Sequence, residues 1–579
     1  MKKEIRINGK VFGVCLVFTL VLINTINAQN GTIQTNVPAL KDVYKNDFKI
    51  GCLLSYAHIG FPTDPVVTGQ SSVVDANGGY LIKYHMNSMS PGNNMKPQYT
   101  VDLNASASAY NAASTQAIKD SVDVNPTIKF NGNIIAQLNW AKRQGFTFRG
   151  HTLVWHSQTP GTAFFRTGYS STGTRLTKEK MTERMGNYIK EVVRIIHESW
   201  PGLLSAFDVV NEAINGNGTD RTTDSEWYTT FGDNTYLMKA FEFARMYTVK
   251  YGETQIKLYY NDYSTEVSAK ADGIVRVCKP IYEAGFLDGI GMQDHDQMSN
   301  PSASSWIASY NKFAPICKEM AVTELDVSTG SGTNSPSAST LANQANQYGQ
   351  LFKCFVERSY YSGRGKIINV SKDGLNDQYT FVTNQSSSLW DTRDQCKAAF
   401  YAVVNVGIFF NKLDSLIKYT STLKQSDYTS ASWSNLSTVL TSAQTIKNSN
   451  YSYGVSAADA LGKAKDDLSA AIKGLVVTST DIASEKNGIP SEYKLAQNYP
   501  NPFNPSTIIS YQLPESGYVT LKVYDILGNE VVVLVNEYKS AGSYNSQFSI
   551  LNYQLTSGIY FYRLQSGSFS DVKKFVVMK

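Results

Sequence analysis

The chain has 579 residues, of which 42% are hydrophobic and 12% aromatic, and its formal charge is +5. Because a single hydrophobic core stops growing at about 250–300 residues, a chain of this length predicts several domains. So small a positive charge over so long a chain does not provide the basic surface that phosphate backbones require. We therefore expect no nucleic-acid partner.

The first 28 residues have the three parts of a secretory signal peptide. Lys2, Lys3 and Arg6 precede an apolar stretch over 11–23, and Ala28 ends a small-residue cleavage site. The apolar stretch is shorter than the ~20 residues that span a bilayer, and no longer apolar stretch follows it. The sequence therefore predicts export without a transmembrane segment. Cleavage would remove four cations and one anion and lower the formal charge to +2.

Six cysteines are scattered along the chain without a CxxC pair. Structural zinc sites and disulfide frameworks use closely spaced cysteines, so this spacing argues against both. Loss of Cys15 with the signal peptide would leave five, and an odd number implies at least one free or intermolecularly paired thiol. The sequence leaves the pairing of the others open.

Residues 36–412 form the largest predicted domain, in which short β runs alternate with helical stretches. The β runs lie at 147–149, 206–210, 257–260 and 320–323, and helical periodicity is clear at 181–198 and 236–251. Polar residues follow each β run at once, such as Asn211 and Glu212 after the second. This pattern is typical of a (β/α)8 TIM barrel of the α/β class, whose active site lies at the carboxyl ends of the strands. An open doubly wound sheet would want a Gly-rich phosphate loop after an early strand, which the sequence lacks.

Residues 413–478 predict a small module of three helices. Apolar residues recur at spacings of three and four over 433–443 and 461–472, and Leu413, Leu416 and Ile417 lie upstream. The segment resembles the FIVAR-type helical modules of exported, surface-associated carbohydrate enzymes. That resemblance implies either glycan binding or a spacer between domains, and we favour the spacer.

Residues 479–492 are a polar linker, and residues 493–579 predict a small β-sandwich. Alternating apolar residues at 508–511 and 519–523 are followed by a turn at 525–529 and two further strands. The motifs NYPNPFNPST (498–507), VYDILGNEV (523–531) and SGIYFYRL (557–564) resemble the C-terminal sorting domain of the Bacteroidetes type IX secretion system. The resemblance implies that the type IX machinery is a partner and that the protein is secreted or displayed on the outer cell surface. An ordinary Ig-like accessory module is the alternative.

Glu212 and Glu324 are the candidate catalytic residues. Hydrolysis of a glycosidic bond needs one carboxyl group to protonate the leaving oxygen and a second to stabilise or trap the oxocarbenium-like centre. The two glutamates each follow a β run and are 112 residues apart, about half of a barrel of β/α units. Taken alone, a glutamate after an apolar run is more often an ordinary surface residue, so the pair needs further support.

Five motifs around these glutamates occur in a fixed order. They are GHTLVWHSQTP (150–160), FDVVNEA (207–213), YYNDYS (259–264), DGIGMQDH (288–295) and VTELDVS (322–328). In this order they resemble glycoside hydrolase family 10, the xylanase family with a (β/α)8 barrel, over about residues 40–410. The resemblance implies a retaining double displacement in which Glu212 is the general acid/base and Glu324 is the nucleophile.

The resemblance also implies roles for the neighbouring residues. Asn211 would hydrogen-bond the sugar 2-hydroxyl, and Gln293 would join the acid/base network. His295 would hold Glu324 ionised, with Asp326 orienting the imidazole. Further substrate contacts are expected from Asn93, Lys96, His151, Trp155 and Tyr263. The chemistry needs neither a metal nor an organic cofactor, so we expect none.

Three positions depart from the family pattern. Gly92 stands where the family usually has a glutamate. Asp373 and Phe381 fall at or near the positions of two tryptophans that normally wall the sugar site next to the cleaved bond. Loss of an indole face weakens stacking on a sugar but leaves the carboxylate chemistry intact. The substrate is therefore less well determined than the reaction.

These observations together predict a secreted retaining endo-β-1,4-xylanase that hydrolyses internal bonds of xylan. One alternative is a hydrolase of the same fold that acts on another β-glycan or on decorated xylan. The other is a catalytically weakened glycan-binding protein, which the three departures favour. Retention of both glutamates, with His295 and Asp326 beside the second, argues against a mere binding protein.

Overall fold

The computed structural model describes residues 33–578 except 55–57, 68–72, 361–362, 452–453, 479–489, 551–552 and 554. The predicted signal peptide (1–28) and most of the predicted linker (479–492) lie outside these residues. The chain divides between Val476 and Val477 into two compact units.

Eight parallel strands of the described chain form a closed barrel in the first unit. In order around the barrel they are β1 (Lys49–Leu54), β2 (Ser88–Pro91), β3 (Thr147–Trp155), β4 (Leu204–Asn211), β5 (Lys257–Asp262), β6 (Gly289–Met292), β8 (Glu319–Ser328) and β9 (Lys366–Asp373). Because β9 pairs with β1 and β6 pairs with β8, the sheet has no free edge. A short strand, β7 (His295–Gln297), adds to β8 at the rim. The closed barrel confirms the predicted (β/α)8 fold and rules out the open sheet.

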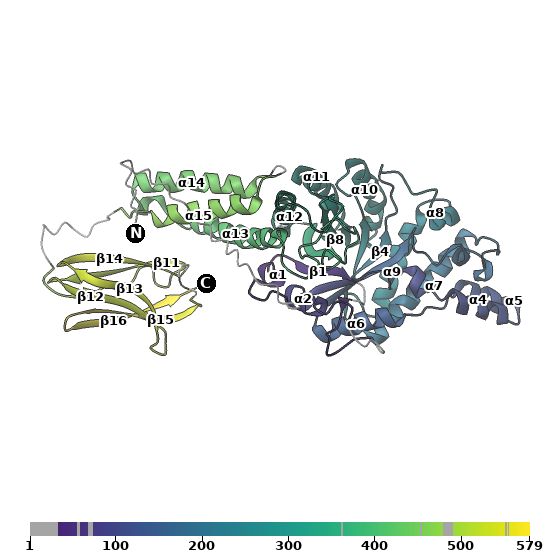
Figure 1. Ribbon diagram of the computed structural model, residues 1–579, viewed down its shortest axis with the longest axis horizontal. Coiled ribbons are helices and arrows are strands. Elements are labelled where there is room, and N and C mark those ends of the chain that lie inside the picture. Colours follow the sequence, from purple (N-terminus) through teal and green to yellow (C-terminus); the bar gives the residue numbers. More distant parts are fainter. Residues whose placement is uncertain are drawn as a thin grey trace, which may run out of the picture. The chain divides into compact units, whose positions relative to one another are not determined.

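Helices alternate with these strands and cover the outside of the barrel (Figure 1). The principal ones are α2 (Gly78–His85), α6 (Gly132–Gln144), α7 (Lys178–Ser199), α9 (Thr235–Lys250), α10 (Ser268–Glu283), α11 (Ala303–Phe313), α12 (Ala338–Ser359) and α13 (Ala398–Thr420). Each turns an apolar face inward. In α7, Met181, Met185 and Ile189 are buried at a spacing of four, and Thr177 caps the helix by accepting a hydrogen bond from the amide of Lys180. Shorter helices lie in the loops: α1 (Leu40–Val43), α3 (Pro97–Thr100), α4 (Leu103–Ala112), α5 (Gln116–Val124) and α8 (Glu226–Phe231).

Two strands run further than the sequence predicts. The β run predicted at 147–149 extends to Trp155, and the one predicted at 320–323 extends to Ser328. Both extensions stay paired with neighbouring strands, that of β8 with β9 up to Leu325 and with β7 from Asp326 to Ser328. Polar residues do not end these strands because their side chains find hydrogen-bond partners inside the barrel. His151, for example, has Nδ1 3.0 Å from Oδ2 of Asp208.

The predicted three-helix module consists of the end of α13 with α14 (Ser430–Asn448) and α15 (Ala457–Lys473). Leu436 of α14 and Leu461 and Leu468 of α15 are buried. α13 runs without interruption across residue 412, so the last helix of the barrel is also the first helix of the module. The Lys353 ammonium group of α12 donates to the carbonyl of Ser449 at 2.7 Å. The module is therefore packed against the barrel within the first unit.

Among the described residues, α13 is the one helix whose length and apolar composition would let it cross a membrane. Several of its apolar side chains, among them Val403, Phe410 and Leu413, are buried inside the first unit. Core helices of folded domains have the same property, so the composition of α13 is accounted for by its packing.

The second unit contains two antiparallel sheets. One has the order β10 (Lys494–Leu495), β11 (Ser506–Leu513), β14 (Gly542–Ser549), and the other has the order β13 (Glu530–Lys539), β12 (Gly517–Tyr524), β15 (Gly558–Ser566), β16 (Phe569–Val577). Ile509, Leu521, Phe548 and Phe575 belong to one core shared by both sheets. Every second residue of β11 is buried, as expected of a strand with one face on a core. This arrangement confirms the predicted β-sandwich.

Candidate active site

Glu212 and Glu324 lie in one cleft at the carboxyl ends of the barrel strands. Glu212 directly follows β4, and Glu324 lies in β8, three strands further round the barrel. The cleft has a volume of about 1040 Å³. Ten of the eleven predicted site residues line it: Asn93, Lys96, His151, Trp155, Asn211, Glu212, Tyr263, Gln293, His295 and Glu324. The eleventh, Asp326, is fully buried beside His295.

The carboxyl group of Glu212 accepts hydrogen bonds from three neutral donors. Its Oε2 accepts from Nε1 of Trp155 at 2.9 Å. Its Oε1 accepts from Nε2 of Gln293 at 2.8 Å and from Nδ2 of Asn211 at 3.2 Å. The donors belong to β3, β4 and the connection between β6 and β7, so three segments of the barrel orient one side chain. They do so without adding positive charge.

The carboxyl group of Glu324 faces positively charged groups instead. Nε2 of His295 lies 3.4 Å from Oε2 of Glu324, and Nδ1 of the same ring lies 3.5 Å from Oδ1 of Asp326. Burial alone would raise the pKa of Glu324, but the hydrogen bond from His295 and the charges of His151 and Lys96 lower it to about 2. Burial alone would lower the pKa of His295, but Asp326 and Glu324 raise it well above its ordinary value. The result is a carboxylate beside an imidazolium.

Asn261, at the end of β5, connects the two glutamates. Its Oδ1 accepts from Oγ1 of Thr323 at 2.7 Å, which fixes the orientation of the amide. Its Nδ2 then donates to Oδ1 of Asn211 and to Oε1 of Glu324, at 3.0 Å in both cases. Asn261 is not among the site residues predicted from the sequence. The signal that points to it is its position in YYNDYS, where it follows a β run as Asn211 does in FDVVNEA.

Lys96 holds together one side of the cleft. Its Nζ donates to Oδ1 of Asn93 and to Oε1 of Gln158 at 2.8 Å each, and it lies 4.5 Å from the centre of the Trp155 ring. Burial lowers the pKa of Lys96, although nearby carboxylates, first that of Glu324, oppose the shift. Gln158 also lines the cleft and is likewise not among the site residues predicted from the sequence.

The other two predicted contacts, His151 and Tyr263, are each anchored from one side. Asp208 bonds to Nδ1 of His151 and also pairs with Arg149. The hydroxyl of Tyr263 accepts from Nη2 of Arg221 at 3.1 Å. Both rings therefore stand in fixed positions at the cleft wall.

The three positions that depart from the family pattern also line the cleft. Gly92 leaves the wall beside Asn93 without a side chain. Burial raises the pKa of Asp373 to about 7, against the opposing charge of His295 and with the help of Asp326 and Glu324. Phe381 is 75% exposed, and its ring centre lies 5.1 Å from that of His295. An acid and an exposed aromatic ring therefore stand beside the Glu324–His295 pair.

His295, Asp326 and Asp373 form the one group of described residues whose geometry would suit a metal ion, with one ligand atom of each within 4.8 Å of the others. Two of the three already support Glu324, and hydrolysis at a carboxyl pair needs no metal. The five cysteines of the described residues are all free, and four of them are buried. None of these cysteines is among the described residues that line the cleft.

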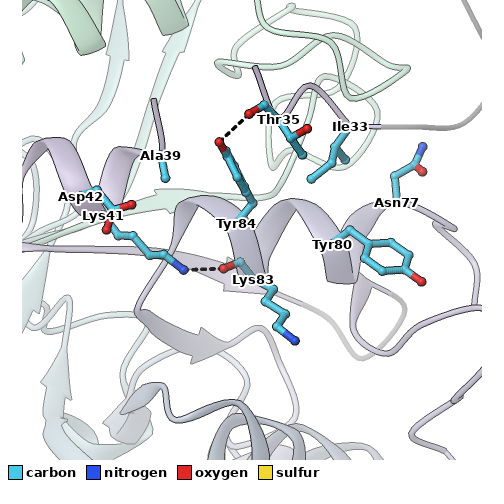
Figure 2. A pocket seen from close by; sticks show the side chains of 9 residues that line it. All are labelled: Ile33, Thr35, Ala39, Lys41, Asp42, Asn77, Tyr80, Lys83 and Tyr84. Carbon is cyan, nitrogen blue, oxygen red and sulfur yellow. Dashed lines mark hydrogen bonds between the residues drawn. The ribbon is translucent and has the colours of Figure 1, made fainter. Parts of the chain in front are cut away.

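A second cavity, of about 860 Å³, lies among the N-terminal residues and helices α1 and α2. Figure 2 shows its lining, in which Tyr84 donates to the carbonyl of Thr35 at 2.8 Å and Lys41 donates to the carbonyl of Lys83 at 2.6 Å. Among its described lining side chains, Asp42 is the one carboxylate. The cavity therefore lacks the carboxyl pair that glycosidic hydrolysis requires.

Comparison with protein families agrees with this geometry. Residues 39–406, more than half of the chain, match the family described as glycosyl hydrolase family 10. The chain belongs to glycosyl hydrolase family 10. Membership of family 10 accounts for the closed barrel and for the order of the motifs that carry Glu212 and Glu324. Residues 497–578 match a second family, described as the secretion system C-terminal sorting domain.

Individual proteins match over a similar part of the chain. Endo-1,4-beta-xylanase Y of Acetivibrio thermocellus is 32% identical over 400 residues, which make up 66% of this chain and 33% of that protein. The chain spans about a third of the length of the first curated relatives that it matches. The CBM22-1–GH10 modules of a Clostridium thermocellum endo-1,4-beta-D-xylanase, solved with xylohexaose, share 31% identity at a TM-score of 0.54 and cover 63% of this chain and 67% of theirs. A mutant of an intracellular xylanase from Thermoanaerobacterium saccharolyticum, solved with xylotriose, shares 25% identity at a TM-score of 0.51 and covers 64% and 99%.

Proposed function

We propose that this chain is a secreted retaining endo-β-1,4-xylanase that cleaves internal bonds of xylan. The observation that carries the proposal is the unequal environment of two glutamates in one cleft. Glu324 is held ionised by His295, whereas neutral donors orient Glu212. Two carboxyl groups with different environments can take the two different roles that glycosidic hydrolysis demands. Relatives named as xylanases, including one solved with xylohexaose, support xylan as the substrate.

In this mechanism Glu324 attacks the anomeric carbon while Glu212 gives its proton to the leaving glycosidic oxygen. The bond to the leaving sugar breaks as an ester forms between the sugar and Glu324. Glu212, now a carboxylate, then takes a proton from a water molecule that hydrolyses this ester, and the anomeric configuration is retained. His295 and Asp326 keep Glu324 ionised for the first step.

The remaining residues bind and orient the sugars. In this proposal Asn211 contacts the 2-hydroxyl group of the sugar that is attacked, an interaction that strengthens in the transition state. Gln293 holds Glu212. Further contacts to the glycan come from Asn93, Lys96, His151, Trp155 and Tyr263.

Azide rescue tests the two roles separately. The variant Glu324→Ala should be inactive on xylan and, with azide, should turn an activated xyloside into the α-azide, because azide replaces the nucleophile. The variant Glu212→Ala with azide should give the β-azide, because azide then opens the glycosyl ester at Glu324. A 2-fluoro-xylobioside inactivator should label Glu324. The opposite pair of azide products, or labelling of another residue, would reverse or reject the assignment.

A second candidate substrate is supported by Asp373, which places a carboxyl group in the cleft where the family usually has an indole. A decorated xylan or another β-glycan is the substrate in that case. Release of reducing sugar from plain xylan, decorated xylan, mixed-linkage glucan, cellulose and mannan separates these possibilities. Activity highest on plain xylan supports the first proposal, and no release from any of them supports a glycan-binding protein.

Two segments support export by the type IX route. Residues 1–28 are the signal peptide in this proposal, and residues 497–578 are the sorting signal that the secretion machinery recognises. Deletion of residues 497–578 should leave the active enzyme in the periplasm. Fractionation of a type IX-competent host, with xylanase activity measured in each fraction, checks this. In the same proposal the helical module (413–478) is a spacer, so substitutions on its surface should leave binding to insoluble xylan unchanged.

A further inference from the structure

The backbone at Glu212 has an unusual conformation for a residue with a side chain. Its φ is +55°, in the left-handed region that non-glycine residues rarely occupy. Such a conformation costs on the order of 1–3 kcal/mol and persists where the surrounding structure holds it in place. The groups that bond to the backbone on either side of Glu212 therefore help to fix where its carboxyl group points, together with the three side chains that bond to that carboxyl group.

One set of these groups is a chain of buried polar residues under the cleft. The amide of Ala213, the residue after Glu212, donates to the hydroxyl of Tyr260 at 3.1 Å. That hydroxyl donates in turn to Oδ2 of Asp262 at 2.6 Å. Oδ1 of Asp262 lies 2.7 Å from the ammonium group of Lys270 on α10, and both side chains are completely buried. The Tyr260–Asp262–Lys270 network thus ends on the backbone next to Glu212.

A second set reaches the same backbone from the other side. Nε of Arg221 donates to the carbonyl of Glu212 at 3.0 Å, and Nη2 of Arg221 donates to the hydroxyl of Tyr263 at 3.1 Å. The ammonium group of Lys270 lies 3.1 Å from the centre of the Tyr263 ring. Both sets therefore meet at Tyr263, which lines the cleft and is in contact with Lys270 below and Arg221 beside it.

Stability alone does not explain a buried ion pair of this kind. Taking two charges out of water costs several kcal/mol per ion, and well-packed apolar side chains of similar volume often serve stability as well or better. What the charged pair adds is a fixed carboxylate: the ion pair with Lys270 holds Asp262 ionised and in place. Oδ2 of Asp262 then orients the hydroxyl of Tyr260 so that its lone pair accepts from Ala213. An apolar replacement would fill the space without this chain of directed bonds.

We propose that Tyr260, Asp262 and Lys270 are positioning residues for the general acid, holding the backbone at Glu212 so that its carboxyl group reaches the leaving oxygen. The inference rests on the proposed role of Glu212 and deepens it. If the general acid is badly positioned, kcat/KM should fall only on substrates whose leaving group needs a proton. Substrates whose leaving group departs unaided should be spared.

The variant Tyr260→Phe removes one hydroxyl and keeps the ring. Burial raises the pKa of Asp262 to about 6, although the charge of Lys270 opposes the shift. At about pH 7.5 the Asp262–Lys270 pair is therefore charged in the wild type. The value of kcat/KM on unactivated xylo-oligosaccharides should fall by at least ~10-fold. On 2,4-dinitrophenyl β-xylobioside, whose leaving group needs no proton, kcat/KM should change by less than about two-fold.

Tyr259→Phe is the matched control. Tyr259 is the preceding residue of β5, is equally buried and also donates to a carboxylate, but that carboxylate is Glu319 at the first residue of β8 (2.7 Å). Its loss should leave kcat/KM unchanged on both substrates. An equal loss on both substrates in Tyr260→Phe, or no loss on the oligosaccharide, would overturn the inference. If Tyr260→Phe does not fold, Asp262→Asn is measured against the same criteria.

Glu212→Gln on the same two substrates separates this inference from the proposed function. If its loss is equal on both, Glu212 is not the acid, and the inference falls together with the assignment. If its loss depends on the leaving group while Tyr260→Phe behaves like Tyr259→Phe, the acid is correct and the positioning role alone is refuted.

Discussion

The ionised state of Glu324 depends on His295, and this dependence can be measured. Two variants separate the contributions of the ring. His295→Ala removes both the hydrogen bond to Glu324 and the positive charge, whereas His295→Gln keeps a hydrogen-bond donor of similar reach towards Glu324 and removes the positive charge. Since His295 also faces Asp326, either change leaves that carboxylate buried without its partner at 3.5 Å.

The size of the effect follows from the pKa of Glu324, which is lowered from 4.5 to about 2. One pKa unit corresponds to ~1.4 kcal/mol, so the surroundings favour the carboxylate by about 3 kcal/mol relative to water even though burial opposes them. Because His295 is the first of the groups that oppose burial, its loss should raise the pKa of Glu324 towards or above the ordinary value. His295→Gln should give a smaller rise.

The assay is the pH dependence of kcat/KM for 2,4-dinitrophenyl β-xylobioside from about pH 3 to about pH 8, because this substrate needs the nucleophile but not the acid. Activity requires ionised Glu324, so it is lost as the pH falls through the pKa of that group. The wild type should stay active to the acid end of the range, and His295→Ala should lose activity below about pH 4.5.

His197→Ala is the control, because His197 pairs with Glu253 at 3.0 Å on the outside of α7 and does not line the cleft. The acid limb of its pH profile, meaning the fall in kcat/KM at low pH, should coincide with that of the wild type. An acid limb that does not move in His295→Ala would refute the claim that His295 keeps Glu324 ionised. A matching movement in His197→Ala would refute the link to the cleft.

Three further predictions concern other parts of the chain. Burial raises the pKa of Asp373 in the folded protein from 3.8 to about 7. The folded protein therefore binds the carboxyl proton of Asp373 more tightly than the unfolded chain does. The stability that this proton contributes is lost as the pH rises from about 4 to about 7. Thermal melts should therefore show Asp373→Asn more stable than the wild type near pH 8 but not near pH 4; a pH-independent difference would contradict this. Phe381→Ala should raise KM for xylan by about 3–10-fold with little change in kcat, because an exposed ring offers a stacking face worth ~1 kcal/mol; an unchanged KM would argue against the contact. Leu461→Ala should lower the free energy of unfolding of the first unit by ~2–4 kcal/mol in a single calorimetric transition, and a separate low-temperature transition would show that the module melts independently.

The barrel could be predicted from the sequence because its elements depend on local periodicity. Buried parallel strands are short apolar runs, and helices such as α7 repeat their apolar residues every three or four positions. The extent of the strands could not be predicted, since the continuation of β3 past His151 depends on Asp208 in the next strand. A polar residue looks like the end of a strand until its partner across the barrel is known.

The same distinction applies to the site. Titratable side chains after β runs, such as Glu212 and Glu324, can be predicted as site residues from their type and position. Asn261 carries no charge, and its importance arises from three contacts to residues 50 or more positions away in the sequence. Gln158 likewise becomes a lining residue only because the loop after β3 brings it to Lys96.

The unbroken course of α13 has a mechanical consequence. With 23 residues at ~1.5 Å per residue, this helix is about 35 Å long. It begins on the barrel and ends inside the module. A change in the angle between module and cleft would require α13 to bend, against the packing of its buried side chains. The polypeptide that leaves the module near Val476 therefore starts from a fixed point relative to Glu212 and Glu324.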